Sequence, residues 1–171
     1  MLVCIYFLSQ PLSIDAVITE RLSSLEIPYT DCKSGQPSFW GGNIQGAIKH
    51  PITLKDNTND RVVYAPHVFG PSTFNHGYFQ QGDFPANMWA IWEEHFGKVK
   101  GATGKAVVIS EFGGDMGSHE DRVWHNCIVD YMTQNGISGF YQGAITADDQ
   151  KTPIQEKMDL LARMTPEPTR L

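Results

Sequence analysis

The stretch KAVVISEFGG, residues 105–114, decides the fold of this chain. Its unbroken apolar run from Ala106 to Ile109 is typical of a strand covered on both faces, as the strands of a parallel sheet are. Glu111 comes just past this predicted strand, where a carboxylate is costly to bury unless it has a partner or a function. The two glycines that follow allow an unusual turn close to a ligand. We therefore expect Glu111 either to serve a site or to cap a loop or pair with a nearby cation.

Strand-like and helical segments alternate on both sides of this stretch. Residues 61–65 predict a first strand and residues 137–141 a third, while helical patterns begin at about Asn87, at the capping residue Ser118 and at Thr152. The side chains expected to face the core are Met88, Ile91, Trp92, His95 and Phe96 in the first helix, Val123, Trp124, Cys127, Ile128, Tyr131 and Met132 in the second, which ends at Asn135-Gly136, and Met158, Leu161 and Met164 in the third. Three successive strand-then-helix units predict an α/β fold with a parallel sheet.

The chain before residue 60 has a different character. Apolar residues at intervals of three and four predict a helix over 13–25. The segment 30–59 is rich in Gly, Pro, Ser and Asn and is predicted to be a long irregular loop, which in a compact domain is more often functional than idle.

A histidine and a glutamate follow two neighbouring predicted strands. His67 comes just past the first strand and Glu111 just past the second. Because parallel α/β sheets place their sites at the carboxyl ends of the strands, both residues are candidates for one site. For His67 alone, a buried structural histidine is the competing interpretation.

The composition excludes several classes of function. The 171 residues are 41% apolar and 19% charged, as in an ordered globular chain. The net charge of −6 provides no basic surface for nucleic acid or anionic membrane, and no stretch approaches a membrane span. Cys4, Cys32 and Cys127 have no metal-binding spacing, and either one disulfide with one thiol or three thiols would fit. We expect no metal and no cofactor, because no phosphate-binding loop or metal motif is present.

Four motifs together resemble the second half of glycoside hydrolase family 5, the cellulase family. They are FWGGNIQGA at 39–47, RVVYAPH at 61–67, FPANM at 84–88 with Ile91-Trp92, and SEFGG at 110–114. The resemblance runs from about Gln36 to Tyr141 with the family's order and spacing. It predicts an unassigned segment at 1–32, the carboxyl-terminal half of the catalytic domain at 33–165 and a tail at 166–171.

This resemblance implies a (β/α)8 TIM barrel, of which the chain would hold about the last three to four βα units. Glu111 matches the family's nucleophile, and His67 matches a histidine that lines the cleft beside it. Trp40 matches an aromatic residue suited to the apolar face of a glucose ring. The implied activity is retaining hydrolysis of a β-1,4-glucan or cello-oligosaccharide, which takes place outside the cell.

The sequence also departs from the family's pattern. It contains no Asn-Glu-Pro, the motif that carries the family's acid/base glutamate. Phe69 stands where the family has a tyrosine that hydrogen-bonds the nucleophile, and Gln142 stands where it has a tryptophan platform. Because a general acid contributes roughly 10²- to 10⁴-fold, we expect very weak turnover, or none, from this chain alone.

Two other interpretations follow from these departures. The chain could be a non-catalytic carbohydrate-binding or interaction remnant that keeps Trp40, His67 and Glu111. Its length is also below the roughly 250 residues of a full barrel, and an incomplete barrel exposes sheet edges that favour self-association.

Overall fold

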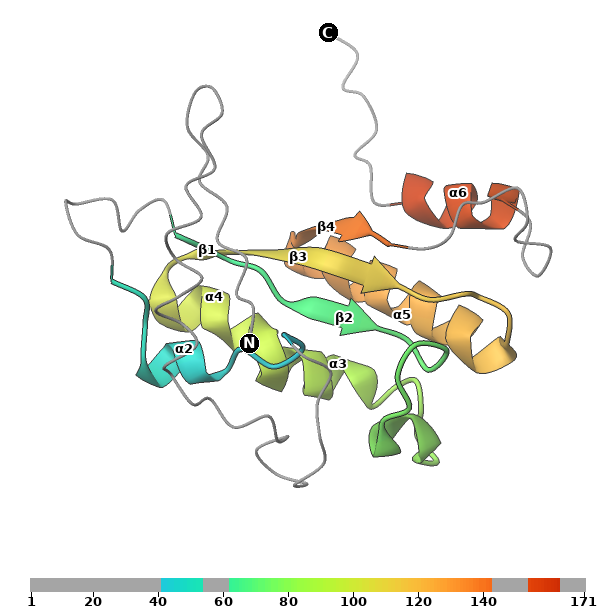
Figure 1. Ribbon diagram of the computed structural model, residues 1–171, viewed down its shortest axis with the longest axis horizontal. Coiled ribbons are helices and arrows are strands. Elements are labelled where there is room, and N and C mark those ends of the chain that lie inside the picture. Colours follow the sequence, from blue (N-terminus) through green and yellow to red (C-terminus); the bar gives the residue numbers. More distant parts are fainter. Residues whose placement is uncertain (1–40, 54–61, 143–153, 164–171) are drawn as a thin grey trace, which may run out of the picture.

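The computed structural model describes residues 41–53, 62–142 and 154–163. A small parallel sheet lies at its centre, and helices α3, α4 and α5 lie along one side of it, while α6 lies near strand β4 (Figure 1). The predicted α/β fold with a parallel sheet is confirmed within these ranges. The helix predicted at 13–25 and the segment 1–32 fall outside the described residues.

Among the described strands, β3 at Ala106–Gly113 is the longest and pairs in parallel with the other three. The chain before it forms two short strands, β1 at Val63–Tyr64 and β2 at His67–Phe69, and β4 at Ser138–Tyr141 follows. The Gly113 carbonyl accepts from Gly70 beyond β2, whereas the neighbouring Phe112 carbonyl accepts from Gln142 beyond β4. Because successive carbonyls of a strand point to opposite edges, β2 and β4 flank β3 on either side.

Two predicted strand ends are corrected by the structure. Glu111 lies within β3 rather than past it, and His67 opens β2 rather than following a finished strand. The first strand is interrupted at Pro66, which has no N–H to donate. The pairing nevertheless continues through this point, because the Ser110 N–H donates to the Pro66 carbonyl at 3.0 Å.

The helix predicted from about Asn87 is present as three joined pieces. They are α3 at Met88–Trp92, a π-helical turn η4 at Glu93–Gly97 and α4 at Lys98–Thr103. Gly104 ends α4 in the left-handed conformation, as glycine commonly does. Two shorter elements precede them, α2 at Gly46–Lys49 and the 3₁₀ helix η3 at Gly77–Gln80.

Helix α5, His119–Asn135, begins and ends where the sequence predicts. The Ser118 hydroxyl accepts from the Asp121 N–H at 3.0 Å, and Gly136 adopts the left-handed conformation after the last turn. Of the six side chains expected to face the core, Trp124, Ile128, Tyr131 and Met132 are buried, while Val123 and Cys127 are half-buried. Cys127 is a free thiol.

Helix α6, Ile154–Ala162, packs against α5, but one of the side chains predicted to face inward is exposed. Leu160 is buried and Leu161 is half-buried, whereas Met158 is 50% exposed. The expected inward position of Met158 is therefore wrong. Thr152 and Met164, the other residues of that prediction, lie outside the described ranges.

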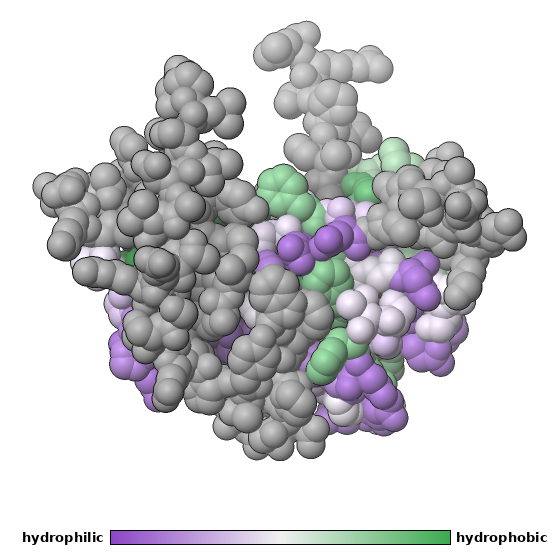
Figure 2. Space-filling model, viewed as in Figure 1, coloured by the Kyte–Doolittle hydropathy of each residue, from purple (hydrophilic) through white to green (hydrophobic). Residues whose placement is uncertain are grey.

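The core lies between the sheet and the helices. Its largest fully buried side chains include Trp124, Tyr64, Tyr131, Phe96 and Phe112. Hydrophilic and hydrophobic residues are mixed over the described surface in Figure 2, and Phe140 and Met158 are its large exposed apolar side chains. Among the described residues, no helix has the length and apolar character that crossing a bilayer requires.

Candidate active site

Strands β2 and β3 bring His67 and Glu111 together. The two residues are direct partners in the parallel register, so their side chains leave the same face of the sheet. Nδ1 of His67 lies 3.6 Å from Oε2 of Glu111. The Glu111 side chain is 33% exposed, whereas His67 is 1% exposed. The carboxylate is thus accessible to a ligand, and the imidazole supports it from the buried side.

The backbone of Gly41 packs against the His67 ring. The His67 N–H donates to the Gly41 carbonyl at 3.1 Å, and a side chain on Gly41 would place its Cβ only 3.2 Å from His67 Cγ. Gly41 also has a φ of 79°, which favours glycine. This close approach helps to bury the imidazole and to fix the ring beside Glu111.

Burial lowers the pKa of His67 below its ordinary value of 6.5, and the Glu111 carboxylate opposes that shift without cancelling it. A lowered pKa leaves the imidazole mostly neutral at pH 7. His67 is therefore suited to hydrogen bonding and orientation at that pH rather than to supplying a fixed positive charge.

The other predicted site residues are distributed around this pair. Phe69 is half-buried at the end of β2, two positions after His67 and so on the same face of the strand. Gln142 is exposed just after β4, and its N–H donates to the Phe112 carbonyl at 2.7 Å, beside Glu111. Trp40 lies outside the described residues.

A group of aromatic and histidine side chains packs beside His67. His76 stacks on Tyr78 with ring centroids 4.5 Å apart, and Tyr78 meets His95 edge-on at 6.3 Å. Together with His67 and Phe69 they line a cavity of about 20 Å³, the room that one water molecule needs. The sequence placed His95 on the buried face of its helix, as observed, but His76 and Tyr78 gave no periodic signal because they lie in and before a 3₁₀ turn.

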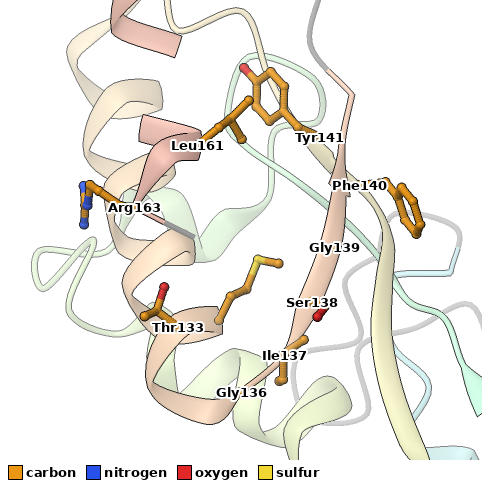
Figure 3. A pocket seen from close by; sticks show the side chains of 10 residues that line it. Thr133, Gly136, Ile137, Ser138, Gly139, Phe140, Tyr141, Leu161 and Arg163 are labelled. Atoms are coloured by element: carbon orange, nitrogen blue, oxygen red, sulfur yellow. The ribbon is translucent and has the colours of Figure 1, made fainter. Parts of the chain in front are cut away.

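A larger cavity of about 720 Å³ lies away from Glu111, between α5, β4 and α6 (Figure 3). Leu161 and Tyr141 face each other across its upper part, while Phe140 points to the other side of β4. Ile137, Ser138 and Gly139 form its wall along the strand. Neither Glu111 nor His67 lines it, so we assign the candidate active site to the surface at the Glu111–His67 pair rather than to this space.

No group of three or more histidine, cysteine, aspartate or glutamate side chains within 41–53, 62–142 and 154–163 is arranged to hold a metal ion.

A second carboxylate and histidine, Asp121 and His125, are both fully buried in the first turns of α5. Their burial was missed from the sequence, because polar residues on a helix are ordinarily assigned to its solvated face.

The sequence profile described as Cellulase (glycosyl hydrolase family 5) matches residues 17–142. The chain belongs to glycoside hydrolase family 5. The family 5 resemblance expected from the four sequence motifs is thereby confirmed.

Two relatives illustrate this membership. The chain is 39% identical over 142 residues to the major extracellular endoglucanase of Xanthomonas campestris pv. campestris, covering 76% of this chain and 28% of the relative. It is 32% identical over 138 residues to an endoglucanase of Paenibacillus polymyxa, covering 74% of this chain and 34% of the relative. The family 5 chain thus spans about a third of the length of these relatives.

Solved structures of the family agree with the fold. The catalytic domain of the Xanthomonas campestris endoglucanase superimposes with a TM-score of 0.67 at 38% identity, covering 79% of this chain and 42% of that chain. A cellotetraose complex of the Pyrococcus horikoshii endocellulase gives a TM-score of 0.66 at 37% identity, and the match covers 76% of this chain and 37% of that chain. The family 5 chain therefore has the fold of part of a family 5 catalytic domain.

Proposed function

We propose that this family 5 chain supplies the nucleophile of a retaining glycoside hydrolase that acts on a β-1,4-glucan, with Glu111 as that nucleophile. The observation that carries the proposal is the Glu111–His67 pair. The carboxylate is one-third exposed on a parallel strand, and a buried imidazole lies 3.6 Å from it. Family membership and endoglucanase relatives support the same reaction class.

In the proposed reaction, an oxygen of Glu111 attacks the anomeric carbon and the bond from that carbon to the leaving oxygen breaks. The leaving oxygen takes up a proton from a general acid, and a covalent glycosyl ester remains on Glu111. Water then attacks the same carbon, loses a proton to the residue that acted as acid, and releases Glu111 as a carboxylate. His67 would keep Glu111 oriented for both steps.

The sequence contains no Asn-Glu-Pro to provide the acid. We therefore assign to this chain the nucleophile's part of the mechanism. Trp40, Phe69 and Gln142 are proposed to contact the sugar. Phe69 would do so through its ring alone, because it has no hydroxyl to donate to Glu111.

We propose a cello-oligosaccharide as the ligand and the extracellular space as the place of action. A related endocellulase has been solved with cellotetraose, and the Xanthomonas relative is named as extracellular. The proposed catalytic segment is 33–165, with three to four βα units of the barrel. Among the described strands β4 pairs with β3 alone, which supports the proposal that the chain self-associates through a sheet edge.

A substrate with a very good leaving group tests the nucleophile without requiring an acid. We would incubate the chain with 2,4-dinitrophenyl 2-deoxy-2-fluoro-β-cellobioside and locate the added mass by peptide mass spectrometry. We expect one sugar on Glu111, no sugar on the Glu111→Gln variant, and unchanged labelling of Glu120→Gln, an exposed glutamate at the start of α5.

The same experiment separates the competing function. Cellotetraose binding by calorimetry without any label would identify a non-catalytic carbohydrate-binding chain. The absence of both cellotetraose binding and covalent labelling would contradict the proposal for this chain. A label that persists in Glu111→Gln would show that another residue is the nucleophile.

A further inference from the structure

Asp121 is a fully buried carboxylate for which the proposed reaction has no use. It lies in the first turn of α5, and its exposed fraction is 0%. A buried carboxylate is unfavourable unless hydrogen bonds replace the water it loses. The groups that provide these bonds therefore indicate what the residue holds in place.

Each oxygen of Asp121 accepts a backbone N–H from a different loop. Oδ1 accepts from Ser72 at 3.2 Å, and Oδ2 accepts from Met116 at 2.7 Å. Ser72 lies in the loop after β2, the strand of His67, and Met116 lies in the loop after β3, the strand of Glu111. One carboxylate thus ties together the loops that continue from the two strands of the candidate site.

The same two loops are joined directly to each other. The Asp115 N–H donates to the Ser72 hydroxyl oxygen at 3.0 Å, and the Gly70 N–H donates to the Gly113 carbonyl at 3.0 Å. Two hydrogen bonds through Asp121 and one directly between the loops therefore hold them, and the Gly70 bond ties the loop after β2 to Gly113, the last residue of β3.

Glycines make room for the carboxylate on both sides. A side chain on Gly70 would overlap Oδ1 of Asp121, and a Cβ on Gly114 would lie 2.6 Å from Oδ2. Both loops therefore approach Asp121 with bare backbone. This fit shows that the two loops pack around this particular carboxylate.

His125, one turn along α5, extends the arrangement to the third strand. Its Nδ1 lies 2.7 Å from the Asp121 carbonyl oxygen, which can only accept, so Nδ1 carries the proton and donates. Its Nε2 faces the Tyr141 hydroxyl at 3.5 Å, at the end of β4. The first turns of α5 consequently contact the loops after β2 and β3 through Asp121 and the end of β4 through His125.

We propose that Asp121 is a positioning residue, which fixes the loops after β2 and β3 and thereby the placement of Glu111 relative to His67. This role rests on the proposed function, since it concerns the geometry of the proposed nucleophile. Asp121 does not touch the substrate, and it acts only through the two backbone segments that it binds.

The Asp121→Asn variant tests this role because asparagine keeps the shape but only one acceptor oxygen. We would follow amide hydrogen exchange by NMR in the full chain. In the unaltered protein the Ser72 and Met116 amides should exchange slowly, although they lie in loops. In Asp121→Asn at least one of them should exchange roughly tenfold faster, while the β3 amides keep their protection.

A second readout reports on the site itself. Replacing Glu111 by Gln should lower the pKa of His67, since the carboxylate raises it. That change should become smaller in an Asp121→Asn background, because the pair is no longer held at its native separation. The control is Asp130→Asn, which removes one charge from the same helix at a side chain that is 50% exposed and should leave both readouts unchanged.

The exchange and pKa readouts test the positioning role of Asp121 independently of the fluoro-glycoside. Fast exchange of Ser72 and Met116 in the unaltered chain would overturn the proposal even if Asp121→Asn failed to fold. The proposal would also be overturned if the Ser72 and Met116 amides stay protected in Asp121→Asn and Glu111→Gln still lowers the pKa of His67 by the full amount in that background. If both readouts change as expected but the fluoro-glycoside does not label Glu111, the proposed function fails and the loop anchoring remains as a structural finding.

Discussion

Within the part of the chain that the structure describes, two carboxylate–histidine pairs have the same separation and different surroundings. Nδ1 of His67 lies 3.6 Å from Glu111, and Nδ1 of His125 lies 3.6 Å from Asp121. Glu111 is 33% exposed, whereas Asp121 is 0% exposed and already accepts two backbone N–H groups. Distance alone therefore does not identify a reactive carboxylate. Accessibility and unused acceptor capacity separate the pair at the proposed site from the pair that anchors loops.

The largest difference between the pairs should appear in stability. Asp121→Ala removes the acceptor of the Ser72 and Met116 amides, of which the second belongs to a buried residue, and should lower the free energy of unfolding by about 3 kcal/mol. Glu111→Ala, at a partly exposed position, should lower it by less than about 1 kcal/mol. Urea unfolding with unchanged m-values measures both. Equal losses in the two variants would remove the distinction between the pairs.

The space around Asp121 gives the next largest effect. Gly70→Ala places a methyl group against Asp121 Oδ1 and within 2.9 Å of Trp124 Cε3, which should cost about 2 kcal/mol. Gly101→Ala is the matched control, since a Cβ there meets nothing within 4 Å. Because Gly101 lies inside helix α4, its replacement should stabilise the chain by about 0.5–1 kcal/mol. A neutral Gly70→Ala would show that the loops are not packed tightly on the carboxylate.

The Glu111–His67 pair should make the free energy of unfolding depend on pH through His67. Burial lowers its folded-state pKa below 6.5, so the unfolded chain binds the proton first as the pH falls. His67 should leave the free energy of unfolding unaffected above about pH 6.5 and reduce it below that value, by no more than about 1.4 kcal/mol per pH unit for one proton.

Urea unfolding of the unaltered chain and of His67→Gln between about pH 5 and pH 8 measures this contribution. We expect the stability of His67→Gln to fall less steeply on acidification. A variant that keeps the full acid slope would assign the proton uptake to other groups.

The smallest expected effect concerns the link from the buried pair to β4. Tyr141→Phe removes a hydroxyl that lies 3.5 Å from His125 and keeps the ring that packs edge-on against Phe112. Because that hydrogen bond is long, we expect less than about 0.5 kcal/mol in urea unfolding. A loss above about 1 kcal/mol would show that the buried network depends on β4 more strongly than its geometry indicates.

Local sequence signals predicted the elements that local chemistry defines. Ser118 and Gly136 bound α5 as expected, and the apolar run before Glu111 forms the central strand. The four motifs in register, SEFGG among them, also led to the correct family. These features were predictable because a cap, a left-handed glycine and an apolar run each act within a few residues.

The remaining features depend on partners far along the chain. Asp121 is buried because Ser72, 49 positions away, donates to it, and no helical periodicity contains that information. The first predicted strand is interrupted at Pro66, which has no N–H to donate. Met158 is exposed because of the way in which α6 packs on α5. The contact of His67 with Glu111 was expected from strand ends, yet its register follows only from the pairing of β2 with β3.

The central claim is that Glu111, and not the equally spaced Asp121, is the reactive carboxylate. Mass spectrometry after reaction with 2,4-dinitrophenyl 2-deoxy-2-fluoro-β-cellobioside tests it most directly. The account predicts one sugar on the peptide that contains Glu111, and at least a roughly 10³-fold slower reaction in Glu111→Gln, as expected when a nucleophile is removed. A sugar on any other carboxylate, or labelling at an unchanged rate in Glu111→Gln, would contradict it.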